Sequence, residues 1–236
     1  MGTAACEALE AAPDLILCGR TGRADDLEPT LRASHADVLV EFTVGSALPA
    51  HISAALDAGV AVVSGTTGVP RHELERFDRR SRERNLGVLV APNFAIGVIL
   101  MQRFAADAAR FLKDVEIIEL HHERKLDAPS GTARATAQRI ASVAAQHLNA
   151  DRPEGRQEAA DARGHVVEDI PIHSVRLPGL LAHQEVLFGG VGELLTIRHD
   201  TTDRRAFMPG VLLAVRQIRD RVGLFHSLEP FLFEDS

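Results

Sequence analysis

Residues 37–64 read DVLVEFTVGSALPAHISAALDAGVAVVS and place two valine-rich runs on either side of a helical stretch. Such runs are typical of buried strands, because β-branched side chains pack well on a pleated sheet. Between them, Leu48, Ile52 and Leu56 recur at four-residue intervals, which predicts an amphipathic helix from 46 to 58. A strand, a helix and a second strand in this order predict two parallel strands joined by a crossover.

The same alternation of short apolar runs and helical stretches continues on both sides of this segment. An Arg-rich run from Arg79 to Arg84 is interleaved with acidic residues, which indicates the solvated face of a helix rather than a track for phosphates. Apolar strands that alternate with helices predict an α/β domain with a parallel sheet and helices on both faces. We expect its strands at 15–18, 37–43, 60–64 and 86–91, and its helices at 4–12, 46–58 and through Glu73 to Phe77.

The pattern changes after Asn93. Strands now gather around one or two helices, which predicts an α+β second domain built on an open mixed sheet. The expected elements are helices at 96–112 and 131–147, strands at 115–120, 172–175, 185–188 and 194–199, and a polar loop at 149–164. A last helix at 207–221 returns to the first domain. We therefore assign 1–94 and 205–236 to the first domain and 95–204 to the second.

Composition narrows the class of protein. The 236 residues are 45% hydrophobic and carry a formal charge of −7, which allows two domains and argues against a nucleic-acid binder. No apolar run is long enough to span a bilayer, so no membrane partner is expected. Cys6 and Cys18 occur without a signal peptide, so we expect two unpaired thiols in a reducing cytoplasm. The histidines show no ligand spacing beyond one adjacent pair, and no metal is expected.

The start of the chain departs from a dinucleotide-binding fold. Such a fold opens with a strand and a glycine-rich turn, after which a helix N-terminus faces the pyrophosphate of the cofactor. Here Met1-Gly2-Thr3 leads directly into a helical stretch, and no G-x-G-x-x-G pattern occurs. Either the sequence begins after that strand or the fold lacks it, and we favour the first.

The segment with the most specific chemistry is 119–133, ELHHERKLDAPSGTA. A strand ends at two histidines, Lys125 follows, and Ser130 or Thr132 can cap the helix that begins there. Free N–H groups at a helix start attract an anion, and an imidazole beside an ammonium can supply a proton. Each feature alone is more often structural, and adjacent histidines on a strand point to opposite faces. Their combination in one short segment favours a site for a small dicarboxylate that needs a proton donor.

Two further segments follow predicted strands and carry weaker signals. Residues 62–68, VVSGTTG, combine glycines that let a ligand approach the backbone with hydroxyls that can bind it. Residues 91–94, APNF, also follow a strand. Both segments are common as turns between strands and helices. By themselves they indicate ordinary loops more often than a ligand site.

The order of these blocks is more specific than any one of them. The chain contains, between residue 1 and about residue 228, VEFT, VVSGTTG, APNFAIGV, VEIIELHHERKLDAPSGTA, HSVRLPG, GELLTIRHD and FMPGVLLA. In this order they resemble the 4-hydroxy-tetrahydrodipicolinate reductase family, and the HHxxKxDAPSGTA block is close to diagnostic of it. This resemblance selects a substrate, whereas the residues alone indicate only a two-domain α/β enzyme that binds an anion.

The resemblance implies a Rossmann-type first domain for NADH or NADPH and a second domain for substrate binding and homotetramer formation. The implied reaction, in lysine and diaminopimelate biosynthesis, transfers a hydride to C4 of the cyclic substrate after its 4-hydroxy form has lost water. His121 would be the general acid and Lys125 its proton-donating or electrostatic partner. The substrate would contact His122, Lys125, Ser130, Gly131 and Thr132, and the nicotinamide half of the cofactor cleft would be lined by Gly65, Thr66, Thr67, Ala91, Pro92, Asn93 and Phe94.

Two departures from the family pattern concern binding. Gly22-Arg23, with Arg20 nearby, stands where the family often has an acidic residue for the adenine ribose. Because cations favour a 2′-phosphate, Arg23 becomes a candidate cofactor residue with a slight preference for NADPH. Gln184 stands where we expect a family histidine, which affects only a peripheral contact.

Two other functions are compatible with parts of the sequence. A two-domain dehydrogenase of amino or imino acids shares the architecture, but it would need a substrate loop other than DAPSGTA. A truncated, cofactor-free homologue acting as a binding or interaction protein is compatible with the missing phosphate loop. Such a protein, however, has no need of a proton donor. Cofactor binding in solution separates the enzyme from this alternative.

Overall fold

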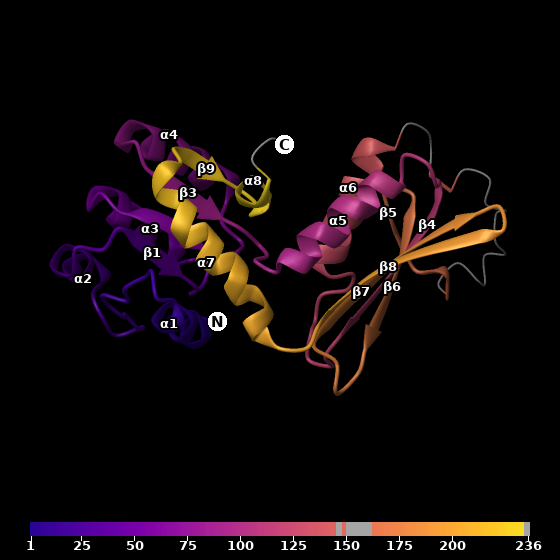
Figure 1. Cartoon of the computed structure of the whole chain (residues 1–236), viewed down its shortest axis with the longest axis horizontal. Helices are drawn as coiled ribbons and strands as arrows, with labels where there is room; N and C mark the ends of the chain where they lie inside the picture. The colour runs from indigo at the N-terminus through magenta and orange to yellow at the C-terminus, as the bar shows by residue number, and fades with distance from the viewer. Residues whose placement is uncertain (145–147, 150–161, 234–236) are drawn as a thin grey trace. The chain divides into compact units, whose positions relative to one another are not determined.

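The computed structural model forms two compact units (Figure 1). The residues that the structure describes are 1–144, 148–149 and 162–233. The first unit contains Met1–Ile96 and Arg204–Ser236, and the second contains Gly97–Asp203. The chain therefore leaves the first unit once and returns to it for its last helices.

The first unit is built on a four-stranded parallel sheet, which confirms the predicted α/β class. The strands lie in the order β1 (Val38–Glu41), β2 (Ala61–Ser64), β3 (Gly87–Val90) and β9 (Gly223–Phe225). Its helices are α1 (Gly2–Ala11), α2 (Leu27–Ser34), α3 (Leu48–Asp57), α4 (Arg71–Arg84), α7 (Met208–Gln217) and α8 (Glu229–Leu232), with 3₁₀ turns at Arg204–Phe207 and Ile218–Asp220. Because the strands are parallel, the loops that follow β2 and β3 leave the same edge of the sheet.

The middle of this unit is a close-packed apolar core. All residues of β2 and β3 are buried, since α3 packs against β2 and α4 packs against β3. Ile52 of α3 and Phe77 of α4 are fully buried, as their predicted apolar faces require. Each such side chain contributes about 1.5–3 kcal/mol by leaving water. At the surface, Arg80 and Arg84 of α4 both pair with Asp57, which fits the predicted solvated helix face.

The predicted strand at 15–18 is wrong. These residues pair with no strand among those described, and the Ile16 side chain is 90% exposed. A strand is stable only when its backbone groups bond to a neighbour, so apolar content alone does not produce one. The sequence also did not predict α2, which begins at Asp26, where the side chain accepts a bond from the N–H of Glu28 at 3.3 Å. It did not predict β9, a strand of only three residues.

The second unit is built on a five-stranded mixed sheet, as predicted. At its centre β4 (Asp114–His121) is parallel to β6 and antiparallel to β7. The other strands and the helices are β5 (His165–Val167), which was not predicted, β6 (Ile170–Arg176), β7 (Ala182–Gly190), β8 (Glu193–Thr201), α5 (Ile96–Ala108) and α6 (Gly131–Val143). Residues 145–147 of the predicted helix and most of the predicted loop at 149–164 lie outside the described residues.

The two faces of this sheet differ. On β4, Val115, Ile117 and Glu119 are buried and alternate with half-buried residues. Helices α5 and α6 lie on the same side of the sheet and cover its buried face (Figure 1). The register places Val175 and Leu194 on the opposite face, where their side chains are 37% and 70% exposed. This open face is only partly polar.

Candidate active site

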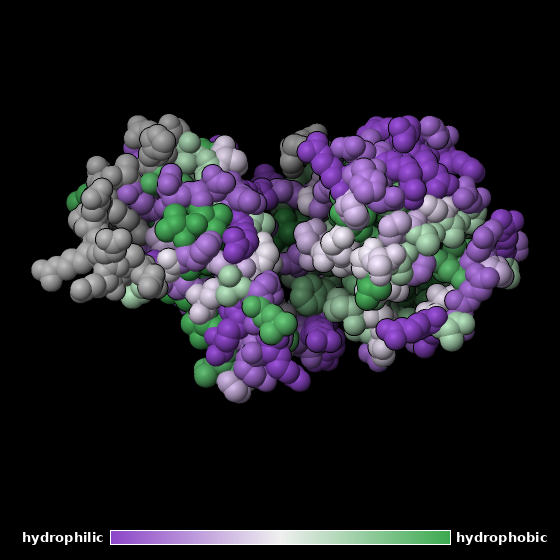
Figure 2. All heavy atoms as spheres, turned by 180° about the vertical axis from the view of Figure 1, so that it is seen from behind, coloured by the Kyte–Doolittle hydropathy of each residue, from purple (hydrophilic) through white to green (hydrophobic). Residues whose placement is uncertain are grey.

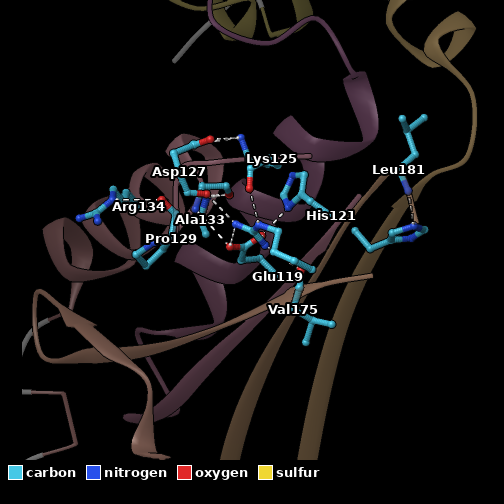
Figure 3. A network of polar contacts seen from close by, with 12 residues as sticks. Glu119, His121, Lys125, Asp127, Pro129, Ala133, Arg134, Val175 and Leu181 are labelled. Atoms are coloured by element: carbon cyan, nitrogen blue, oxygen red, sulfur yellow. Dashed lines mark hydrogen bonds and ion pairs between the residues drawn. The ribbon is translucent and has the colours of Figure 1, made fainter. Parts of the chain in front are cut away.

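The candidate site is centred on the carboxyl end of β4. Glu119 and His121 are two residues apart on this strand and therefore point to the same face of the sheet. The parallel register with β6 pairs Glu119 with Ser174 and His121 with Arg176. Figure 3 shows Glu119 and His121 close together, with Lys125 in the loop above them.

Glu119 and Arg176 form an ion pair in which the carboxylate is fully buried and the Arg176 side chain is 18% exposed. The Glu119 side chain has no exposed surface, and Arg176 donates to both of its oxygens, from Nη2 to Oε1 at 2.7 Å and from Nη1 to Oε2 at 3.0 Å. Burial by itself raises the pKa of this carboxyl, but hydrogen bonds from His121, Arg176 and Ser174 outweigh burial and lower the pKa to about 2. Glu119 is therefore a carboxylate at neutral pH and can only accept hydrogen bonds.

This carboxylate fixes the tautomer of His121. Nδ1 of His121 is hydrogen-bonded to Oε2 of Glu119, and because the carboxylate cannot donate, Nδ1 must carry the proton. The other ring nitrogen, Nε2, is then the acceptor of the neutral imidazole or the second donor of the imidazolium. Only 13% of the His121 side chain is exposed. The ring is thus oriented as a general acid or base requires, with Nε2 as its reactive atom.

The adjacent His122 is half-buried, and its Nδ1 is buried without a hydrogen-bond partner in the described part of the chain. A buried polar atom without a partner is uncommon and costs roughly 1–3 kcal/mol. A ligand that bonded to this atom would recover that energy. His122 is accordingly a candidate ligand contact.

The ammonium of Lys125 is already engaged within its own loop. Nζ donates to both oxygens of Asp127, at 2.8 and 2.9 Å, and this bond lowers the pKa of Asp127. Arg176 holds the same loop by donating to the backbone carbonyls of Lys125 at 3.3 Å and Asp127 at 2.7 Å. Because Asp127 is exposed, a ligand carboxylate can compete with it for the ammonium.

The start of α6 joins this network. The hydroxyl of Ser130 caps the helix by accepting a bond from the N–H of Ala133 at 3.2 Å, and the N–H of Ser130 donates to Oε1 of Glu119 at 3.3 Å. Gly131 is exposed and has no atom within 4 Å of the position that a Cβ would occupy. The backbone N–H groups of Gly131 and Thr132 lie in the first turn of α6 and have no acceptor within the helix, which suits an anion. The Ser130 hydroxyl, in contrast, is committed to the cap.

Sequence reasoning missed Glu119 and Arg176. Glu119 belongs to a row on β4 whose other buried members, Val115 and Ile117, are apolar, and a charged residue in such a row signals a buried partner. That signal identifies one half of the pair. Arg176 cannot be found in this way, because it lies 57 residues further along the chain and only the sheet register brings it to Glu119.

Gln184 of β7 has a structural role. It is 5% exposed, and its amide donates to the hydroxyl of Thr136 on α6 at 2.8 Å. Gln102 of α5 donates to the same hydroxyl at 3.1 Å. The residue that replaces the expected family histidine therefore ties the sheet to both of its helices.

The residues proposed for the nicotinamide lie in the first unit, in the loops that follow β2 and β3. Thr66, Thr67 and Pro92 line a pocket there, together with Gly68, Val69, Leu74, Val90 and His226. The carboxyl edge of a parallel sheet is where α/β folds bind their ligands. These three residues share one pocket, and their role in cofactor binding stays a prediction.

The other predicted cofactor residues of these two loops make packing and hydrogen-bond contacts within the first unit. A Cβ on Gly65 would lie 2.1 Å from the ring of Phe42, so packing within the unit already requires glycine there. Phe94 is buried and meets Phe42 edge to face, with ring centroids 5.9 Å apart. Ala91 is also buried, and the Asn93 side chain accepts a bond from a backbone N–H at 2.8 Å. These contacts fix the loop conformation.

A second buried carboxylate, which sequence reasoning also missed, supports the same edge of the sheet. Glu41 accepts hydrogen bonds from the hydroxyl of Ser64 at 2.7 Å and from the N–H and hydroxyl of Thr43, and it lies 3.4 Å from Nδ1 of His51. Burial raises the pKa of Glu41, but these bonds lower it overall. The Thr66 hydroxyl also accepts from the N–H of Thr43 at 3.0 Å. The cluster thereby ties the end of β1 to the loop after β2.

Arg23, the candidate for a 2′-phosphate, lies in an exposed turn. The N–H of Gly22 donates to the Asp25 carboxylate at 2.6 Å and fixes this turn, while Arg20 pairs with Glu10. Arg23 is accessible to a ligand in this position.

Across residues 1–144, 148–149 and 162–233, no three His, Cys, Asp or Glu side chains are grouped so that they could hold a metal ion. Within the same residues, no helix has both the length and the hydropathy of a membrane span.

The chain matches one protein family over nearly its whole length. Residues 1–94 match the family model "Dihydrodipicolinate reductase, N-terminus", and residues 97–232 match "Dihydrodipicolinate reductase, C-terminus". The chain is 43% identical over 232 residues to the 4-hydroxy-tetrahydrodipicolinate reductase of Coxiella burnetii, an alignment that covers 98% of this chain and 95% of the relative. It is 48% identical over 235 residues to the enzyme of the same name from Cutibacterium acnes, with 98% and 94% covered.

Solved structures give the same result. A dipicolinate-bound dihydrodipicolinate reductase from Paenisporosarcina sp. TG-14 superposes with a TM-score of 0.85 at 38% identity, covering 97% of this chain and 94% of that one. An amine dehydrogenase from Mycobacterium smegmatis, at 12% identity and a TM-score of 0.54 over 86% of this chain and 78% of its own, shares the fold alone. With family models that match nearly the whole chain and relatives of this identity, the chain belongs to the dihydrodipicolinate reductase family.

Proposed function

We propose that this chain reduces 4-hydroxy-tetrahydrodipicolinate to tetrahydrodipicolinate, with NADH or NADPH as the hydride source, in lysine and diaminopimelate biosynthesis. The observation that carries the proposal is the oriented His121. Its Nδ1 is held by a buried carboxylate and its Nε2 is left for a ligand, in a chain whose relatives carry the name of this enzyme. A protein that only bound the compound would have no use for such a ring.

The reaction needs one hydride and one proton. NADH or NADPH, when bound, would supply the hydride to C4 of the ring, from which the 4-hydroxy group leaves as water. His121 supplies the proton from Nε2, so that negative charge does not remain on the conjugated dicarboxylate. Nδ1 is bonded to Glu119. This bond would keep the ring in one orientation during the reaction, while Nε2 loses and regains its proton.

The substrate carboxylates meet the positive end of the site. The N–H groups of Gly131 and Thr132 provide a helix start for one carboxylate, and Lys125 provides a cation for the other. Lys125 must exchange its bond to Asp127 for one to the substrate. The unpartnered Nδ1 of His122 supplies a further contact.

For the cofactor, the donor set of the first unit fits a nicotinamide and its ribose. The hydroxyls and backbone of Thr66 and Thr67, with Pro92, line the pocket, while Gly65, Ala91, Asn93 and Phe94 shape its loops. Arg23, which is exposed in a turn, would offer a cation to a 2′-phosphate, and we therefore expect a slight preference for NADPH.

We also propose a homotetramer in the cytoplasm, assembled through the open face of the five-stranded sheet. Exposed apolar side chains on this face include Val166, Val175 and Leu194. The surface of the second unit carries apolar patches between polar side chains (Figure 2). A sheet that has helices on only one face gains stability when a partner covers the other face.

The experiment follows the absorbance of NADPH and of NADH while the substrate is generated in situ from pyruvate and aspartate semialdehyde. We expect oxidation of both cofactors, faster with NADPH, and none without the substrate. Calorimetric titration with each cofactor is run in parallel. A folded chain that binds neither cofactor and oxidises neither would instead support a cofactor-free binding protein.

A further inference from the structure

We propose that the Arg176–Glu119 ion pair is the positioning element of the site, which sets three of its parts at once: the His121 ring, the Lys125 loop and the start of α6. The inference rests on the proposed function, since it assigns a purpose to the pair within that reaction. Neither residue needs to touch the substrate.

Glu119 makes two of these connections. Its Oε2 accepts from Nδ1 of His121, and its Oε1 accepts from the N–H of Ser130, the residue that caps α6. The proposed proton donor and the proposed anion-binding helix start are therefore both hydrogen-bonded to the same carboxylate. A shift of Glu119 would move both, and an error of one ångström in such a site costs up to about 100-fold in rate.

Arg176 makes the third connection. Beyond its two bonds to Glu119, its Nε and Nη2 donate to the backbone carbonyls of Lys125 and Asp127, at 3.3 and 2.7 Å. These bonds hold the backbone of the loop and leave the side chains of Lys125 and Asp127 to meet each other or a ligand. One guanidinium thus links β6, the carboxylate of β4 and the lysine loop.

The burial of the pair argues against a purely stabilising role. Replacing a buried ion pair by apolar side chains of similar size is often neutral or favourable for stability, whereas removing one partner leaves an unpaired buried charge. Stability alone therefore gives no reason to keep Arg176 and Glu119. The bonds that both side chains make to the reactive part of the site give one.

This contrast provides a test that separates positioning from folding. Three variants are compared with the wild type: Glu119→Leu, Arg176→Met and the double variant. Each is measured for melting temperature, kcat and KM. The two single variants lose stability because each leaves a largely buried charge without its opposite charge, and the double variant recovers most of the loss.

The variants should rank differently in kcat than in melting temperature. We expect kcat to fall roughly 10- to 100-fold in Glu119→Leu and to stay low in the double variant, because neither has an acceptor for Nδ1 of His121. Glu119→Gln, whose amide oxygen still accepts that bond, recovers part of the loss. KM rises in Arg176→Met and in the double variant, where the lysine loop is released.

The control is Asp78→Asn in the first unit. Asp78 pairs with Arg82 and accepts from the N–H of Leu224 at 2.9 Å, so its loss lowers the melting temperature while kcat is retained. If kcat of the double variant returned to the wild-type value together with stability, the pair would be only structural and the inference would be wrong. A wild-type chain without turnover would contradict the proposed function itself.

Discussion

At the scale of single residues, the site depends on how a carboxylate and an imidazole share a proton. Glu119 is kept ionised by the groups around it, so His121 has one ring nitrogen fixed and one available. Lys125 has the reverse arrangement, because its partner Asp127 is exposed and replaceable. The fixed bond orients the proposed proton donor, and the exposed bond can be exchanged for a bond to a ligand carboxylate.

The lowered pKa of Glu119 predicts a loss of stability in acid. Its folded-state pKa of about 2 lies below the ordinary value of 4.5, so the native state binds fewer protons than the unfolded state between these values. The stabilisation is complete above about pH 4.5 and is lost as the pH falls towards 2. It amounts to about 2 kcal/mol between roughly pH 6 and pH 3.

Urea unfolding at these two pH values checks this prediction. The free energy of unfolding should fall with pH by about 2 kcal/mol more in the wild type than in the variant that carries Glu119→Leu and Arg176→Met. Equal losses in both proteins would show that Glu119 does not have the lowered pKa.

The sequence predicts this chemistry in part. The segment 119–133 indicates the histidines, the lysine and the helix start, because a strand end, a loop and a cap are local features. The pairing of Lys125 with Asp127 and of Ser130 with Ala133 is local as well. Arg176 is absent from that prediction, because its approach to Glu119 is decided by strand register across the sheet.

At the scale of elements, the start of α6 combines a structural role with the proposed binding role. The Ser130 hydroxyl caps the helix, whereas the Thr132 side chain is not part of the cap. Ser130→Ala should therefore lower stability by about 1 kcal/mol and also weaken substrate binding. Thr132→Val keeps the backbone N–H and removes the hydroxyl, which the family resemblance assigns to the substrate, so it should raise KM modestly without a comparable loss of stability.

Melting temperatures and KM values of the two variants check this division. Ser142→Ala is the matched control, because Ser142 lies near the other end of α6 and donates to the carbonyl of Arg139 at 2.7 Å. Full stability in Ser130→Ala would mean that the cap contributes nothing to α6.

The loop after β2 allows a similar separation of packing from binding. A Cβ on Gly65 would collide with the ring of Phe42, so Gly65→Ala should cost about 1–3 kcal/mol. Adding Phe42→Leu should recover part of that loss by making room. Urea unfolding and cofactor titration of both variants provide the measurement. Unchanged stability in Gly65→Ala with lost cofactor affinity would mean that the glycine is needed by the ligand and not by the fold.

At the scale of the whole molecule, the alternation of strands and helices predicted the parallel sheet, and the later cluster of strands predicted the mixed sheet. The segment 15–18 shows what such patterns miss. Its composition suits a strand, but a strand exists only beside another strand, and no described strand lies next to it. Composition is local, whereas strand pairing belongs to the whole sheet.

The proposed assembly is also a property at this scale. An acidic residue at Val175 or Leu194 would place a charge on the open sheet face, so Val175→Asp and Leu194→Asp should shift the homotetramer towards smaller species. Light scattering coupled to size exclusion measures the mass directly. Asp107→Asn on α5, on the other side of the sheet, should leave it unchanged. A monomeric wild type would contradict the proposed assembly.

The role of His121 as the proton donor of a reductase can be measured in the turnover of His121→Gln. With substrate generated from pyruvate and aspartate semialdehyde, the wild type and the surface control His72→Gln should oxidise NADPH at the same rate. In His121→Gln, kcat should fall by roughly 10²- to 10⁴-fold while KM changes little, because the proton is needed only as charge develops. An unchanged kcat in His121→Gln would mean that His121 is not the proton donor.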